Sequence, residues 1–258
     1  MPNIVSIYWR KAGDKVQFAL LTDRGKIRVK NEDSVYARMV TENTVFFMVA
    51  DGMGGHGYGD IASGIAYEIV NIQSEKSISA IINGEDPEKV LLSLVTEINN
   101  RIMEQCSLKR EMTGMGTTLV IAAVCDGKLY ISNVGDSRLY LYRKSQLTLL
   151  TVDHSVVQEM YDQGLISKEE ADDHPQKNIL TRAVGCDDIV DPDYFEYDVE
   201  NDDILILCTD GLTNMVEDRI INDMLEQKKD LEVLCKELIT LANQNGGSDN
   251  ITCIVVRI

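Results

Sequence analysis

The sequence is poor in proline and in basic charge, and both shortages limit what the protein can be. Only four of the 258 residues are proline, and the chain contains nothing typical of an interdomain linker, so we expect one domain over residues 1–258. The formal charge is −17, and such a field repels nucleic acid and anionic membrane surfaces. The longest basic cluster, residues 24–30, runs directly into Glu32 and Asp33. We therefore expect neither nucleic acid nor a membrane as a partner.

Cysteine, histidine and long apolar runs are also too sparse or too scattered for several functions. The six cysteines form no Cys-x-x-Cys pair, and three of them lie in apolar runs, which favours buried thiols in a reducing compartment. His56, His154 and His174 lack a zinc-type spacing. No apolar run approaches about 18 residues, and the N-terminus lacks a signal-type apolar region, so the cytoplasm is the expected location.

The hydrophobic pattern predicts an α+β protein with mainly antiparallel strands. Runs of β-branched and aromatic residues predict strands at 16–22, 45–50, 117–125, 129–134, 139–143, 204–209 and 251–257. Helical periodicity predicts helices at 60–74, 87–106, 217–227 and 231–243, and a short one at 155–162. Strands come in runs with helices grouped between them, which argues against alternating βαβ units. The polar, acidic segment 152–190 is interpreted as a flap over the domain.

Acidic residues fall at the ends of the predicted strands. Asp51, Asp136 and Asp210 each follow an apolar run, and Asp249 precedes one. A fifth acidic position, residues 31–33, stands before another strand-like run. Carboxylates that converge would repel one another unless cations neutralise them. Oxygen ligands without histidine or cysteine suit magnesium or manganese and disfavour zinc.

An Asp-Gly pair is more often a tight turn than a site, and the chain contains a comparison case. Asp126 and Gly127 join two strand-like runs at hairpin spacing, so we interpret them as a turn without chemistry. Asp51 is instead followed by a glycine-rich loop and a helix, and Asp210 by a loop that opens a helix. Neither of these two pairs is a hairpin turn.

Taken in chain order, these motifs resemble the type 2C, or PPM, metal-dependent serine/threonine phosphatases in their compact bacterial form. The match covers nearly the whole chain, and its segments are TDRGKIRVKNEDS, VADGMGGHGYGD, TGMGTTL, NVGDSRLYLY, ILTRAVG, LCTDGLTNMV and GGSDNIT. The resemblance implies a four-layer α-β-β-α sandwich, in which two antiparallel sheets are flanked by helices and a metal site lies in a cleft at one edge.

The resemblance also implies a set of metal ligands. Asp51 would bridge two metals, the Gly52 carbonyl would bind one of them, and Asp210 with Asp249 would complete the other. Glu32 would contribute directly or through a water.

A third metal and a phosphate contact follow from the same resemblance. Asp136 would help to hold that metal and would share Asp210 with the first, which gives two to three ions of Mn or Mg. Arg28 matches the arginine that holds the substrate phosphate. A metal-activated water would then hydrolyse phosphoserine and phosphothreonine on proteins with no phosphoenzyme. The implied partners are phosphorylated protein substrates, with a cognate serine/threonine kinase or a small sigma-regulator phosphoprotein as the alternatives, and the enzyme is expected to be a monomer.

Two positions depart from the family pattern. Met53 stands where many eukaryotic members have a histidine that would protonate the leaving group, so metal-bound water is expected to serve instead. His56 is expected only to pack against or cap its loop. Asn214 replaces the aspartate of most relatives, so we expect neither an accessory-metal role nor a supporting one for it.

Three other functions compete with the phosphatase. Residues 52–57 satisfy Gly-x-Gly-x-x-Gly, but Asp51 would repel a pyrophosphate, and no second strand ends in an acidic residue about 20 positions later, as a dinucleotide site requires. A calcium binder would need an Asp-x-Asp-x-Asp-Gly loop, which the sequence lacks. A catalytically weak or non-enzymatic family member, acting as a signalling or binding module, would be expected to have lost Asp51, Asp210 or Asp249, and all three are present.

Overall fold

The computed structural model describes residues 5–9, 16–54, 57–172 and 174–258, and its first sheet has six strands. Every neighbouring pair in this sheet is antiparallel. The strands lie in the order β1 (Val5–Trp9), β2 (Gln17–Asp23), β12 (Ile251–Arg257), β11 (Ile204–Cys208), β8 (Arg138–Arg143) and β9 (Gln146–Leu149). The chain therefore returns from its far end to place its last strand in the middle of this sheet.

The second sheet faces the first and is also antiparallel. Its strands lie in the order β10 (Asp193–Asp198), β7 (Lys128–Val134), β6 (Leu119–Cys125), β4 (Thr44–Met53) and β3 (Asp33–Thr41), and the short β5 (Gly116–Thr117) pairs with the end of β4.

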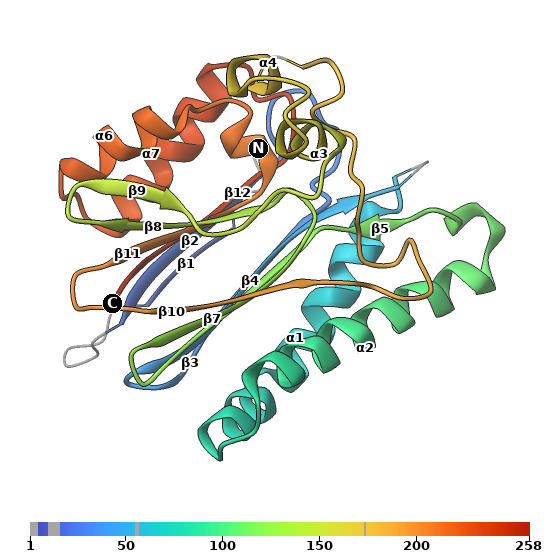
Figure 1. The fold of residues 1–258 in the computed structure, drawn as a ribbon, viewed down its shortest axis with the longest axis horizontal. Coiled ribbons are helices and arrows are strands. Elements are labelled where there is room, and N and C mark those ends of the chain that lie inside the picture. The colour runs from blue at the N-terminus through green and yellow to red at the C-terminus, as the bar shows by residue number, and fades with distance from the viewer. Residues whose placement is uncertain (1–4, 10–15, 55–56, 173) are drawn as a thin grey trace.

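Helices cover the outer face of each sheet (Figure 1). On the second sheet lie α1 (Gly59–Ile82) and α2 (Pro87–Leu108), followed by the 3-10 turn Arg110–Met112. On the first lie α5 (Asp210–Thr213), α6 (Asp218–Glu226) and α7 (Leu231–Gln244). The shorter α3 (Val156–Asp162) and α4 (Lys168–Asp172) lie together at one end of the sandwich. The predicted α+β class and four-layer α-β-β-α sandwich are confirmed.

The alternation of side chains along the strands builds three apolar layers. In β4, Phe47 and Val49 point into the layer between the two sheets, whereas Phe46 and Met48 pack in the layer beneath α1 and α2. Since both faces of β4 are buried, its sequence is a continuous apolar run without polar alternation. The third layer lies between the first sheet and the helices α5 to α7.

Two predictions about secondary structure need correction. The first helix was predicted to end at Ser74, but α1 continues to Ile82 because Ile78 and Ile81 extend its buried stripe. The segment 152–190 was predicted to be irregular apart from one short helix, yet it also contains α4. It is tied to the body of the fold where Val184 and Thr117 exchange two backbone hydrogen bonds of 2.9 Å. Among the helices within the described ranges, none has the length and apolarity to cross a membrane.

Candidate active site

The register of the strands brings the acidic segments to one edge of the sandwich. Asp33 at the start of β3 lies directly opposite Asp51 near the end of β4. In the other sheet, Cys208 at the end of β11 lies opposite both Arg138, which begins β8, and Cys253 near the start of β12. The ends of these strands at which the chain enters or leaves them therefore lie next to one another.

The remaining predicted aspartates lie next to those strand ends. Asp210 comes two residues after Cys208, Asp136 two residues before Arg138, and Asp249 two residues before Ile251. In the sequence, Asp51 and Asp249 are separated by most of the chain. Antiparallel pairing within each sheet and the packing of one sheet on the other bring these carboxylates together.

The glycine after each of two aspartates allows adjacent segments to approach closely. A β-carbon on Gly211 would overlap the carbonyl oxygen of Asn250, next to Asp249. A β-carbon on Gly52 would overlap the carbonyl oxygen of Gly59 in the same way. Backbone atoms cannot move aside as a flexible side chain can, so only glycine fits at these contacts. This explains the Asp-Gly pairs without a hairpin turn.

Four aspartates at this edge, Asp33, Asp51, Asp136 and Asp210, have a raised pKa. Burial is the largest cause of the raised pKa of Asp51, followed by the charges of Asp33, Asp210, Asp136 and Asp249. Burial first, and neighbouring carboxylates after it, also raise the pKa of Asp33 to about 7, of Asp136 to about 8 and of Asp210 to about 6. These groups thus form one electrostatically coupled cluster, in which negative charge is disfavoured until a cation offsets it.

Three carboxylate oxygens in this region are buried without a hydrogen-bond partner: Glu32 Oε1, Asp33 Oδ1 and Asp210 Oδ1. An unpaired buried carboxylate oxygen is costly, and a divalent cation or its bound water would satisfy it. The donor set contains only oxygen, which is what magnesium and manganese prefer. The residues present therefore fit the predicted ions.

The cluster is not a closed cage. Within the described part of the chain, no group of three or more His, Cys, Asp and Glu side chains is arranged to hold a metal ion by itself. This agrees with the chemistry of magnesium, which keeps several of its waters and is bound through one or two carboxylates. An open cluster of this kind leaves room for water and for a phosphate group.

Asp33 is a site residue that sequence reasoning passed over in favour of Glu32. Its Oδ2 accepts hydrogen bonds from the hydroxyls of Thr209 (2.9 Å), which directly follows β11, and of Thr252 (2.6 Å) in β12. The Thr252 hydroxyl is also hydrogen-bonded to that of Thr22, at 2.7 Å. These bonds hold Oδ2 of Asp33 in place, whereas its Oδ1 has no hydrogen-bond partner. Only the pairing of Asp33 with Asp51 across β3 and β4 could have signalled it, and a linear sequence does not show that pairing.

The expectation that Asn214 has no supporting role at the site is wrong. Its side-chain nitrogen donates a hydrogen bond of 2.9 Å to Asp210 Oδ2. The amide therefore orients Asp210, because one carboxylate oxygen is held while the other, Oδ1, remains unpartnered. An aspartate at this position could not donate such a bond in its charged form.

Arg28 and the remaining predicted residues also lie at the cluster. Arg28 Nη2 donates to Asp249 Oδ2 at 2.7 Å, and the arginine charge also acts on Asp51 and Glu32. The backbone nitrogen of Gly52 donates to the carbonyl oxygen of Glu32 at 3.1 Å. The structure thus brings together all seven residues that were predicted to bind metal or phosphate.

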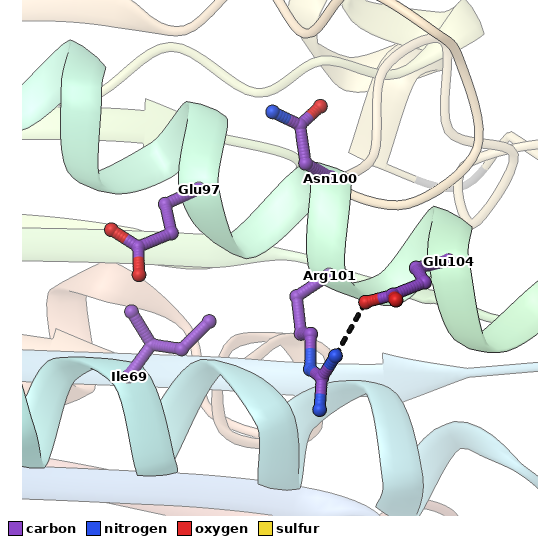
Figure 2. A pocket seen from close by; sticks show the side chains of 5 residues that line it. All are labelled: Ile69, Glu97, Asn100, Arg101 and Glu104. Carbon is purple, nitrogen blue, oxygen red and sulfur yellow. Dashed lines mark hydrogen bonds and ion pairs between the residues drawn. The ribbon is translucent and has the colours of Figure 1, made fainter.

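The comparison case behaves as predicted. Asp126, with φ 49°, and Gly127, with φ 79°, form the turn between β6 and β7, at the opposite end of those strands from Asp136. The expectation for His56 falls outside the described residues. A surface pocket of about 440 Å³ lies elsewhere, between α1 and α2, and is lined by Ile69, Glu97, Asn100, Arg101 and Glu104 (Figure 2). None of the predicted site residues lines this pocket.

Two facing antiparallel sheets with an open cluster of oxygen ligands at one edge define a class of divalent-cation-binding α-β-β-α sandwiches. Residues 28–255 match the protein phosphatase 2C family, and the chain belongs to that family. It is 43% identical over 236 residues to the serine/threonine phosphatase stp of Listeria welshimeri, an alignment that covers 92% of this chain and 93% of the relative.

Solved structures agree with this assignment. The serine/threonine phosphatase PstP/Ppp of Mycobacterium tuberculosis is 34% identical, with a TM-score of 0.86, over 94% of this chain and 98% of that one. A structure of the PstP catalytic domain in complex with two manganese ions is 33% identical, with a TM-score of 0.83, over 94% of this chain and 97% of that one.

Proposed function

We propose that this chain is a metal-dependent protein phosphatase that hydrolyses phosphoserine and phosphothreonine on other proteins without a phosphoenzyme. The observation that carries the proposal is the set of buried, unpaired carboxylate oxygens on Glu32, Asp33 and Asp210 within a mutually repelling cluster. The names of the family relatives, which are serine/threonine phosphatases, support the same reaction.

In this proposal the cluster holds two to three ions of Mn or Mg. The residues that would hold them are Asp51, the Gly52 carbonyl, Asp210, Asp249, Glu32 and Asp136. Such ions, when bound, provide a water of lowered pKa as nucleophile and offset charge on the phosphoryl oxygens. To this set we add Asp33, whose free oxygen is aimed by two threonine hydroxyls.

The protein's own groups would position the substrate and the ligands. Arg28 is the phosphate-binding residue of this proposal, since its planar guanidinium can donate to two phosphate oxygens at once. Its ion pair with Asp249 keeps the guanidinium at the edge of the cluster. Asn214 orients Asp210, and Thr209 and Thr252 orient Asp33, so that these ligands need little rearrangement.

The biological setting that we propose rests on the chemistry of the site and of the cysteines. Phosphorylated proteins are the substrates, and a cognate serine/threonine kinase would supply them. The enzyme would act as a monomer and a single domain, with segment 152–190 as a flap. The six cysteines are free thiols, which fits the reducing cytoplasm that we propose as its location.

Metal removal tests the proposal directly. The purified protein should release phosphate from a phosphothreonine peptide in the presence of manganese, stop when excess chelator is added, and resume when manganese or magnesium is restored. Turnover that continues unchanged in chelator would refute the metal-dependent mechanism. Tight binding of the phosphopeptide with no phosphate release at any metal concentration would instead favour the non-enzymatic signalling module.

A further inference from the structure

The loop of residues 24–30, between β2 and β3, has a tightly fixed backbone beside the acidic cluster. The backbone nitrogen of Lys26 donates to the carbonyl oxygen of Gly247 at 2.8 Å. The side-chain amide of the buried Asn250 donates to the carbonyl oxygens of Arg24 (2.9 Å) and Lys30 (2.8 Å), and so holds both ends of the loop. The loop therefore keeps its place without burying its own side chains.

Two large aliphatic side chains of this loop face the solvent. Ile27 is 69% exposed and Val29 is 87% exposed, and they flank Arg28, whose guanidinium contacts Asp249. A single exposed aliphatic residue is ordinary and needs no explanation. Here two of them border the residue that would hold the substrate phosphate, on a loop whose backbone is already fixed. Because these two side chains are exposed, they contribute little to the stability of the fold. A partner that binds at Arg28 can therefore cover them.

The charge of the loop contrasts with that of the molecule. Its exposed basic residues are Arg24, Lys26, Arg28 and Lys30, whereas the chain as a whole carries a formal charge of −17. One of these, Lys30, is paired with Asp60 at 3.2 Å. A segment bearing phosphate or carboxylate groups would be repelled by most of the surface and attracted to this loop.

We propose, on the basis of the phosphatase function above, that loop 24–30 selects the substrate sequence. It favours phosphorylated segments that carry a large aliphatic side chain next to the phosphorylated residue and acidic side chains beyond it. Ile27 and Val29 bury the aliphatic side chain, and Lys26 attracts the acidic ones. Arg28 holds the phosphate itself and is common to all substrates, so preference between substrates comes from its neighbours.

Phosphothreonine peptides of matched length test this selection. Two peptides have leucine or valine on both sides of the phosphothreonine, and two have serine there. In each pair, one peptide has acidic residues beyond these positions and the other has neutral residues. With the parent protein, kcat/KM should be about tenfold higher for the aliphatic peptides than for the serine peptides, mainly through KM, because burying an aliphatic side chain contributes free energy of that order.

The double variant Ile27→Ser, Val29→Ser should remove this preference. The ratio of kcat/KM for the aliphatic peptide to that for a small aryl phosphate should fall about tenfold in the variant, since an aryl phosphate has no side chains to bury. The matched control is Ile72→Ser on α1, which removes a 78% exposed isoleucine outside the loop and should leave the ratio unchanged. Lys26→Gln should reduce the preference for the acidic peptides and its sensitivity to salt.

The possible outcomes separate this inference from the proposed function. If the parent protein hydrolyses all four peptides with equal kcat/KM, or if the double variant keeps the aliphatic preference, loop 24–30 does not select substrates, although the phosphatase function stands. If the parent protein hydrolyses none of the peptides and no aryl phosphate with manganese present, the proposed function fails and this inference fails with it.

Discussion

The side-chain amide of Asn214 donates a hydrogen bond of 2.9 Å to the carboxylate of Asp210, four residues earlier. Both residues belong to the turn of α5, in which the Asn214 backbone nitrogen also bonds to the Asp210 carbonyl oxygen at 2.7 Å. The chain therefore places a neutral hydrogen-bond donor next to this carboxylate. This bond holds one carboxylate oxygen of Asp210 in place within the turn.

Substitutions at Asn214 should change stability in a way that depends on metal. Asn214→Ala removes a hydrogen bond to a carboxylate and should cost about 1.5–3 kcal/mol, or roughly 3–12 °C in a chain of this size. Asn214→Asp places like charges together, so it should lower the melting temperature more without metal and gain more from added manganese. Thermal unfolding with and without manganese measures both effects. If Asn214→Asp lowers the melting temperature equally with and without manganese, a second carboxylate at this position does not help to bind a cation.

Asp210 and Asp126 should differ sharply although both stand in Asp-Gly pairs. Asp210→Asn weakens a metal ligand at the centre of the cluster, and turnover should fall by about 100-fold or more at fixed manganese. Asp126→Asn should leave turnover close to that of the parent, because asparagine tolerates the left-handed backbone of the β6–β7 turn. Steady-state phosphate release compares the two variants. A larger loss of turnover in Asp126→Asn than in Asp210→Asn would show that Asp126 is more than a turn residue and that Asp210 is not an essential ligand.

Gly211→Ala should separate two segments that carry ligands. The added β-carbon would overlap the carbonyl oxygen of Asn250, so the loops that hold Asp210 and Asp249 must move apart. We expect a loss of about 1–3 kcal/mol or more in the free energy of unfolding, together with weaker manganese binding by titration.

The matched control for that change is Gly64→Ala in α1. Nothing lies within 4 Å of the position its β-carbon would take, so this helix position should gain about 0.5–1 kcal/mol from the better helix former. Equal effects of the two alanines would mean that the close approach at Gly211 is unimportant.

The metal-free protein should lose stability as the pH rises. Burial and mutual repulsion raise the pKa of Asp210 to about 6, of Asp33 to about 7 and of Asp136 to about 8, so the folded chain binds these protons more tightly than the unfolded chain. The stability linked to these groups is complete below about pH 4 and is lost as the pH passes through the folded-state values.

Thermal unfolding in chelator between pH 5.5 and 8.5 measures this loss, and Asp136→Asn should make the decline shallower. Manganese should oppose the decline, since cation binding requires the deprotonated carboxylates. A melting temperature in chelator that rises with pH over this range would contradict the coupled cluster.

The cluster itself shows how far the linear sequence could lead. Asp51, Asp136, Asp210 and Asp249 were predicted from their positions at the ends of apolar runs, because a strand end is visible in local composition. Asp33 was passed over, because its importance comes from lying opposite Asp51 and from two threonines at the edge of the other sheet. Asn214 was misjudged for the same reason, since a hydrogen-bond partner cannot be read from residue type.

The sequence by itself determined the α+β class, the strands whose side chains are mostly buried, and the Asp-Gly pair that is only a turn. Each of these follows from side-chain periodicity and turn chemistry, which act over a few neighbouring residues. The tertiary structure alone decided that carboxylates from both sheets share one edge, that Arg28 lies against Asp249, and that loop 24–30 exposes Ile27 and Val29. These depend on strand register and close backbone approach between segments more than 200 positions apart, such as the 221 that separate Arg28 from Asp249, and only the folded chain specifies them.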